Sequence, residues 1–482
     1  MRLFFRSFRF CSEHAVALAA LAACAILLLP APVIGIADNG DFARVMGAGG
    51  LEYADRAEPW NDRYFRYSHH HYAYGRFGTG GYGSSQLPLL FAAGSLSRLF
   101  AGRFDIRLLS MLYALLLAAA LHTLVKAAKT RSRRANGLLA AALALVFLDI
   151  GYLAYFNSLY GEPAAMIFFL LTAGLGLRAA RAEDGSPRPL LRFYAAAAAL
   201  ACAKLQYAPI GLAFALFGLR LRQASPARPW RRTAAAGAAA LLLLSAGMVA
   251  AAPSGLKEIN LYQTVFYGVL KDSPTPGSDL QALGLKKELA VLAGTNYFQK
   301  DVPIPKNDPR LTEGLYPNIS RLDILRFYAA RPERLVQKLE RAAANGMYIR
   351  PYYLGNYEKA AGKPPGALAH RFSAWSEFKR AVLPHRLAVV LSVFAAYLGL
   401  AAPALLRPAD AAAKRSAEMH LCIAAAGGLA FLVPILGDGE ADLAKHLFLF
   451  NVCFDWMAVY AGVLLFVRLG EFARRLRERR PG

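Results

Sequence analysis

Long apolar stretches alternate with short basic loops along most of the chain, and this pattern predicts an all-α membrane protein that crosses the bilayer many times. An apolar run of about 18 or more residues is long enough to span the hydrocarbon core as a helix. We expect about ten transmembrane helices. Seven lie near residues 15–37, 107–125, 137–155, 233–252, 387–406, 419–436 and 447–467, one begins at Pro163, and two short ones flank residues 204–209 within 191–219.

The basic residues predict how these helices are oriented. Cytoplasmic loops of membrane proteins carry an excess of Lys and Arg. Basic groups precede the first helix at Arg2, Arg6 and Arg9, and they recur in every second loop, at 126–134, 178–192, 220–232, 407–415 and 468–480. We therefore expect both termini in the cytoplasm (N-in/C-in). The formal net charge of +24 belongs to these loops, so we expect no nucleic-acid partner.

The polar segments suggest three regions. We expect a transmembrane core at residues 1–252 with an outer loop at 38–105, an extracytoplasmic subdomain at 253–384, and C-terminal transmembrane helices with a basic cytoplasmic tail at 385–482. Within the outer loop, the apolar patch 87–100 is too short for a span and predicts an interfacial helix on the outer leaflet. The first apolar run has span length, which indicates an uncleaved anchor. The five cysteines form neither a disulfide framework nor a zinc-binding spacing.

In this topology the notable polar groups gather on the outer face. Asp38 and Asp41 follow the first apolar run, Glu162 starts a helix before Pro163, and Lys204 lies at an outward helix tip. Placing an ionisable side chain inside or at the edge of the bilayer costs free energy, so the residues found there are often functional. Each also has an ordinary explanation, since turns favour Asp, helix N-termini favour Glu, and lysines snorkel to the interface.

Other polar clusters predict structure rather than chemistry. Consecutive histidines do not converge on one metal ion, so we expect residues 69–71 in a solvated loop; the aromatic residues around them fit a membrane interface belt and sugar stacking equally well. The acidic residues Asp438, Glu440 and Asp442 lack the twelve-residue calcium-loop pattern and are interpreted as a polar turn. We expect Asp455, inside the last helix, to be hydrogen-bonded to another helix.

Four phrases of the sequence carry a resemblance to a known superfamily. They are Asp38-Asn39-Gly40-Asp41-Phe42, Tyr155-Phe156-Asn157-Ser158-Leu159-Tyr160-Gly161-Glu162-Pro163, Lys204-Leu205-Gln206-Tyr207 and His446-Leu447-Phe448-Leu449-Phe450-Asn451. Together with an Asp after the first helix and an interfacial helix in the first outer loop, they resemble the GT-C superfamily of integral membrane glycosyltransferases. Within it, they are similar to bacterial hexosyltransferases of cell-surface glycan biosynthesis. The resemblance covers most of the membrane part, whereas residues 253–384 match only loosely.

The resemblance implies an inverting transfer of a hexose from a polyprenyl-phosphate donor to a glycan acceptor outside the bacterial plasma membrane. It places the general base at Asp38 or Asp41, without deciding between them, and we lean slightly to Asp41, with Glu162 as a second catalytic carboxylate. The candidate residues for binding the donor phosphate or the acceptor are Asn157, Tyr160, Lys204, Gln206, Tyr207, Arg350 and His446, of which Arg350 lies outside the four phrases. The resemblance permits a divalent cation in the site but does not require one.

Two other functions are compatible with a multi-span protein of this kind, namely a flippase or transporter of lipid-linked glycans and a non-catalytic partner of a polysaccharide synthase. A transporter would carry ionisable residues along the depth of its spans. The gathering of polar groups at one face favours the transferase.

Overall fold

The computed structural model describes residues 11–100, 102–130 and 132–478; the basic segments 1–10 and 479–482 and Arg131 lie outside the described residues. Within that part of the chain, six helices are long and apolar enough to cross a membrane. They are α5 (Ile106–Ala128), α8 (Glu162–Ala180), α11 (Arg228–Ala250), α18 (Leu387–Leu406), α19 (Ala411–Asp438) and α21 (Phe448–Glu478). A seventh candidate is a broken helix, in which α6 (Arg133–Phe147) meets α7 (Ile150–Leu153) and η1 (Ala154–Asn157) at 51°.

Three further predicted spans are helical but short: α1 (Ser12–Leu28), α9 (Arg188–Ala201) and α10 (Ile210–Arg220). The protein is thus a multi-pass membrane protein, as predicted, with helices at all ten predicted places; the number of crossings and the orientation remain predictions. The predicted first helix was too long. It ends at Leu28 rather than near Ala37, because Pro30 and Pro32 follow and proline cannot continue a helix.

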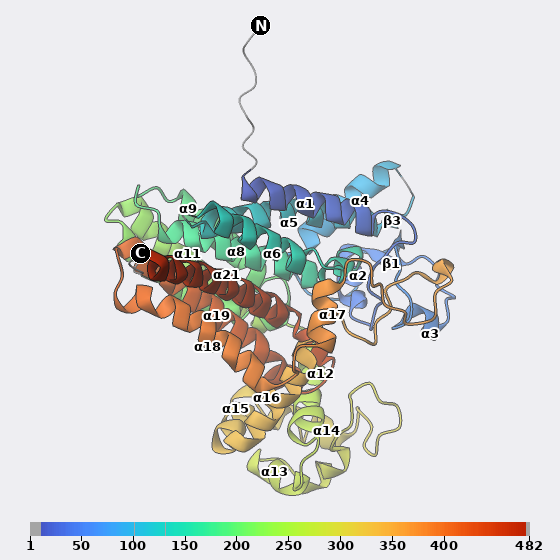
Figure 1. Ribbon diagram of the computed structural model, residues 1–482. Helices are drawn as coiled ribbons and strands as arrows, with labels where there is room; N and C mark the ends of the chain where they lie inside the picture. The colour runs from blue at the N-terminus through green and yellow to red at the C-terminus, as the bar shows by residue number, and fades with distance from the viewer. Residues whose placement is uncertain (1–10, 101, 131, 479–482) are drawn as a thin grey trace.

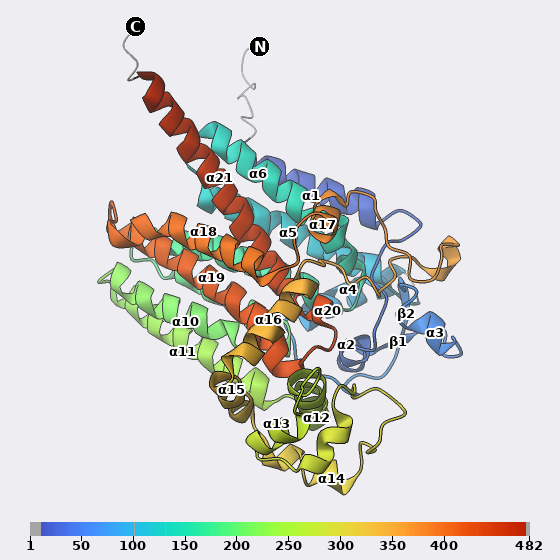
Figure 2. The ribbon, with the colours of Figure 1, turned by 60° about the horizontal axis from the view of Figure 1, so that its bottom comes forward.

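The long helices pack into one bundle with a shared apolar core. Helix α5 lies between α1 and α8, α8 also contacts α9, and α18, α19 and α21 contact one another (Figure 1). Helices α10 and α11 lie side by side next to α19 (Figure 2). Trp230 and Trp456 are among the largest side chains that this core buries completely.

The outer loop folds into a small mixed layer at one end of the bundle. Its elements are α2 (Phe42–Gly49), β1 (Leu51–Tyr53), α3 (Trp60–Arg63), β2 (His71–Tyr74), α4 (Leu87–Phe100) and β3 (Phe104–Asp105). The three strands are antiparallel in the order β1-β2-β3, with Glu52 opposite Ala73 and Tyr72 opposite Phe104. Helix α4 forms at the predicted residues. The histidines were wrongly expected in a solvated loop: they lead into β2 half-buried, and His69 and His70 pair with Glu58 and Glu358.

The long segment after α11 is also helical. Its elements are α12 (Ser254–Thr264), the π-helix η4 (Val265–Val269), α13 (Pro276–Ala282), η5 (Lys287–Leu292), α14 (Pro309–Thr312), η6 (Tyr316–Asn318), α15 (Arg321–Ala330), α16 (Pro332–Gly346), η7 (Lys359–Ala361) and α17 (Ala374–Ala381). Residues 262–328 bury an apolar cluster of their own, in the lobe around α13 and α14 (Figure 1). The part from Ala342 to Ala369 packs instead into the core of the bundle.

Candidate functional site

The stretch from Asp38 to Asp41 is held in place by backbone contacts with the long segment. After α1 the chain runs extended, and the N–H groups of Gly35 and Ala37 donate to the carbonyls of Asn356 and Gly355. The amide of Asn157 donates to the carbonyls of Leu28 and Ile34, which fixes the same turn from the side of η1. Residues far apart in the sequence therefore set the position of the two aspartates.

The two aspartates have different surroundings. Asp38 is 1% exposed, and its carboxylate accepts hydrogen bonds from the N–H groups of Gly40 and Phe42 and from the Tyr53 hydroxyl. Burial raises the pKa of Asp38, against the lowering effect of these donors. Its oxygens are occupied in starting α2, so Asp38 shapes the loop.

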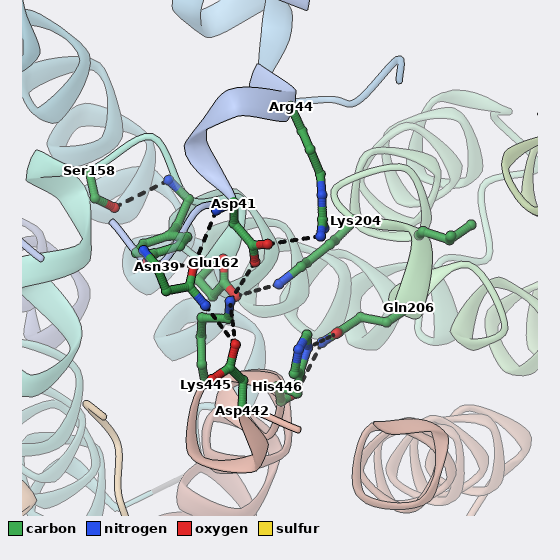
Figure 3. A network of polar contacts seen from close by, with 12 residues as sticks. Asn39, Asp41, Arg44, Ser158, Glu162, Lys204, Gln206, Asp442, Lys445 and His446 are labelled. Carbon is green, nitrogen blue, oxygen red and sulfur yellow. Dashed lines mark hydrogen bonds and ion pairs between the residues drawn. The ribbon is translucent and has the colours of Figure 1, made fainter. Parts of the chain in front are cut away.

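Asp41 instead points its carboxylate into a cavity, with 16% of the side chain exposed. It pairs with Lys445 and, at 2.8 Å, with Arg44 (Figure 3). Burial alone would raise the pKa of Asp41, but the charges of Lys445 and Arg44 outweigh it and hold the pKa well below its usual value. Asp41 is therefore the ionised, cavity-facing carboxylate of the pair.

A second ion pair closes the site beside Asp41. The Nζ of Lys204, which directly precedes η2 (Leu205–Tyr207), lies 2.8 Å from Oε1 of Glu162 at the start of α8. The other oxygen of Glu162 is buried and has no hydrogen-bond partner. Lys204 also lines the cavity, so this cation is oriented by Glu162 and accessible to a ligand.

The turn between α19 and α21, which contains α20 (Leu443–His446), supplies the opposite wall. Asp442 accepts a hydrogen bond of 2.7 Å from the Asn39 amide. His446 contacts Gln206 through Nδ1 (Figure 3). Its Nε2 lies 3.2 Å from the carboxylate of Asp438. Burial, together with the charges of Lys204 and Lys445, lowers the pKa of His446 well below its usual value, so this imidazole is neutral.

These groups line one end of a cavity of about 1140 Å³. Its charged end contains Asn39, Asp41, Arg44, Lys204, Gln206, Asp438, Asp442 and His446. Its largely apolar wall, where α10, α11, α12 and α19 meet, contains Pro209, Val249, Ala252, Leu256, Ile259, Leu261, Val433, Pro434 and Leu436. Two further cations, Lys257 and Arg321, also line the cavity. A smaller cavity of about 30 Å³, lined by Tyr160 and Glu162 among others, adjoins the charged end and shares Asp41 and Lys204 with it.

Aromatic side chains from two different segments line the same cavity. Trp60, Tyr64 and Phe65 come from the outer loop, and Phe298 comes from the long segment. Phe65 adopts a φ of 67°, a left-handed conformation that costs a bulky residue on the order of 1 to 3 kcal/mol. Backbone hydrogen bonds hold it there: its N–H donates to the carbonyl of Asp38, and its own carbonyl accepts from Gly355.

The structure brings most of the sequence-predicted residues together. Asp41, Glu162, Lys204, Gln206 and His446 meet at the charged end. Tyr160 holds the loop before Asp41 in place, since its hydroxyl contacts Asn39 and donates to the carbonyl of Ala37.

Four predicted binding residues do not line the large cavity: Tyr160, which lines the smaller one, and Arg350, Asn157 and Tyr207. Arg350 is buried against Asn356, the carbonyl of Ala369 and Glu377, so its charge braces the long segment. Asn157 is used by the turn after α1, and Tyr207 is buried.

The sequence reasoning missed Arg44, Lys445 and Asn39, and it interpreted the acidic residues at 438–442 as a simple turn. Asp438 and Asp442 in fact line the cavity, while Glu440 pairs with Lys271 and Lys338 and thereby ties the long segment to this turn. Two signals were available: Asn39 lies inside the first of the four phrases, and Lys445 directly precedes the fourth.

Among the described residues, the one group of His, Cys, Asp and Glu side chains close enough together to hold a metal ion is Cys11, Glu13 and His14 at the start of α1. None of these three lines the cavity. In the cavity, Asp41 pairs with Arg44 and Lys445 instead, and Asp442 lies 3.6 Å from Lys445.

A family model described as YfdI N-terminal transmembrane domain matches residues 6–480, nearly the whole chain. No curated protein and no solved structure matches the chain.

Proposed function

Because the chain belongs to the YfdI N-terminal transmembrane domain family, we propose that it is a membrane glycosyltransferase of the GT-C kind. In this proposal it transfers a hexose from a polyprenyl-phosphate donor to a cell-surface glycan on the outer side of a bacterial plasma membrane, with inversion. The family assignment supports a membrane protein; the reaction is inferred from the cavity.

The observation that carries the proposal is a single cavity with a charged end and an apolar wall. A polyprenyl-phosphate sugar has the same division, with an apolar chain, an anionic phosphate and a polar sugar. The wall at Val249, Leu256 and Val433 suits the isoprenoid units next to the phosphate. Arg44 and Lys204 suit the phosphate, because both cations line the charged end.

The chemistry then follows from the positions of the charges. The bond between the anomeric carbon and the phosphate oxygen breaks, and its electron pair leaves with the phosphate, whose developing charge Lys204 and Arg44 stabilise. The acceptor hydroxyl attacks the opposite face of the sugar, and its proton passes to Asp41. A carboxylate of low pKa accepts this proton late, when bond formation has made the hydroxyl strongly acidic. Glu162 orients Lys204, and Lys445 keeps Asp41 ionised.

The test is a transfer assay with the purified full-length protein in lipid nanodiscs. Radiolabelled polyprenyl-phosphate hexoses serve as donors, and surface polysaccharide from cells that lack the gene serves as acceptor. We expect label to enter the polysaccharide from one donor, and this incorporation to be lost in Asp41→Asn at normal expression. Transbilayer movement of the donor without incorporation would instead identify a flippase, and an inactive protein needed by another synthase would identify an assembly partner.

A further inference from the structure

The rim of the cavity carries an aromatic group that the proposed reaction at the charged end does not use. We define the aromatic mouth as Trp60, Tyr64, Phe65 and Phe298. Trp60 is 64% exposed and Phe298 is 65% exposed, yet both line the cavity that contains Asp41. Large apolar side chains left this open at the entrance of a polar cavity require an explanation.

We infer that the aromatic mouth is a carbohydrate-binding subsite that stacks a neutral pyranose ring of the acceptor glycan. One face of a pyranose presents C–H groups, which pack on the electron-rich face of an aromatic ring. The rings come from two separate segments that line the same cavity, so a sugar bound there is within reach of both. Asn39, Asn296 and Ser320 line the same cavity and can bond sugar hydroxyls. That the bound sugar belongs to the acceptor glycan rests on the proposed function. That the aromatic mouth binds a sugar does not.

The backbone supports this inference independently of exposure. Phe65 keeps its left-handed conformation because Asp38 and Gly355 bond it on both sides. Strain of this kind persists where the surrounding structure enforces it, and it is concentrated at ligand sites. This backbone hydrogen bond joins Phe65 to Asp38, which is three residues before Asp41 in the sequence. A sugar stacked at the mouth would therefore be held at a set distance from the proposed base.

A membrane anchor is the other role for exposed aromatic residues, and the surroundings of Trp60 argue against it. The chain on either side of Trp60 is charged, at Asp55, Arg56, Asp62 and Arg63, and Asp62 pairs with Lys359 of the long segment. A helix that lies on a bilayer needs a continuous apolar face, which α3 does not have. A lone Trp beside aromatic partners fits a sugar better than a lipid surface.

The test uses the emission of Trp60, since the other three tryptophans are shielded: Trp230 and Trp456 are fully buried, and Trp375 is partly buried and bonded to Asp455. The full-length protein in nanodiscs is titrated with lipid-free surface polysaccharide from cells that lack the gene. We expect saturable protection of Trp60 from acrylamide quenching, also in Asp41→Asn, with the Trp60→Phe signal as background. Affinity measured by calorimetry should fall at least tenfold in Trp60→Ala and Phe298→Ala but not in Tyr352→Ala, an exposed aromatic outside the cavity.

The outcomes separate this subsite from the proposed reaction. Binding that depends on the aromatic mouth without any sugar transfer would leave the subsite standing and refute the transferase. Transfer with an unchanged acceptor KM in both Trp60→Ala and Phe298→Ala would refute the subsite and leave the transferase standing. Absence of protection in the wild-type protein, or quenching of Trp60 by brominated lipids, would also overturn the inference, the latter by placing Trp60 in the membrane.

Discussion

The ammonium group of Lys204 and the carboxylate of Glu162 form a buried ion pair, 2.8 Å long, that joins the tip between α9 and α10 to the start of α8. Removing one member of such a pair leaves an uncompensated buried charge, whereas removing both does not. Lys204 also lines the cavity. Single and double variants of the pair can therefore distinguish a structural role of Lys204 from a role in binding the donor phosphate.

We predict that Lys204→Met lowers the free energy of unfolding by about 3 to 5 kcal/mol and transfer on the order of 10²-fold. The double variant Lys204→Met/Glu162→Gln should recover most of the stability but not the transfer, because the phosphate still lacks its cation. Thermal unfolding and the transfer assay measure the two effects. An active double variant would show that Lys204 serves the fold alone.

The contacts of the two aspartates predict opposite results for one chemical change. Asp41→Asn should lower kcat about 10²- to 10⁴-fold, because the amide cannot accept the proton. Asp38→Asn should keep most activity and stability, because the amide oxygen of Asn can still accept hydrogen bonds from the N–H groups of Gly40 and Phe42. Circular dichroism controls for folding. If Asp38→Asn were inactive while Asp41→Asn kept its rate, the assignment of the base would be reversed.

The sequence predicts which residues lie near helix ends, but it does not predict contacts between side chains that are far apart in the chain. The apolar runs placed the helices correctly, and Asp41, Lys204 and His446, which the sequence put near helix ends, line one cavity, with Glu162 paired to Lys204. It did not separate Asp38 from Asp41, because that difference depends on Tyr53, Arg44 and Lys445, which are distant in sequence or unremarkable alone.

The misassigned Arg350 illustrates the opposite failure. An arginine among tyrosines resembles a phosphate ligand in sequence, but the fold buries it against Glu377 and the carbonyl of Ala369. For Asp455, in contrast, the sequence predicted a hydrogen-bonded partner on another helix, and this is confirmed. That partner is Lys379 of α17 together with Tyr152 of α7, which no local pattern indicates.

The low pKa of Asp41 predicts the pH dependence of both stability and rate. The folded-state pKa lies below the usual 3.8, so the ionised carboxylate contributes stability above that value, and the contribution is lost as the pH falls through the folded-state pKa. Lys445→Met should raise this pKa by about 1 to 3 units. The acid limb of the pH–rate profile should then move to higher pH by the same amount.

The control for the pH experiment is Lys363→Met, an exposed lysine that does not line the cavity. Its acid limb should coincide with that of the wild-type protein. An acid limb that stays in place in Lys445→Met would mean that the rate is controlled by a group other than Asp41.

The orientation can be tested by labelling one cysteine in the long segment. In a variant with all five native cysteines replaced, Gln299→Cys offers an exposed position close to the aromatic mouth. We expect a membrane-impermeant maleimide to label it in intact spheroplasts. Labelling only after lysis would place the segment in the cytoplasm, and it would exclude a reaction on the outer face.

The pair of Lys379 and Asp455 predicts how the long segment is fastened to the bundle. Both side chains are fully buried, 2.7 Å apart, and Asp455 also accepts from Tyr152 and from the Trp375 indole. Burial lowers the pKa of Lys379, and the neighbouring carboxylate of Asp455 only partly offsets this effect. Desolvation of the ammonium group is therefore unfavourable. Lys379→Met should therefore destabilise the protein by about 3 to 5 kcal/mol.

The double variant Lys379→Met/Asp455→Leu should regain part of that loss, since no buried charge remains, although Tyr152 and Trp375 lose their acceptor. Neither residue lines the cavity, so the acceptor and donor KM of the folded double variant should match those of the wild-type protein. Thermal unfolding and steady-state kinetics on the same preparation check both expectations. A stable double variant with a raised KM would show that a shift of α17 changes the cavity. Gly355, which is bonded to both Phe65 and Ala37, would connect the two.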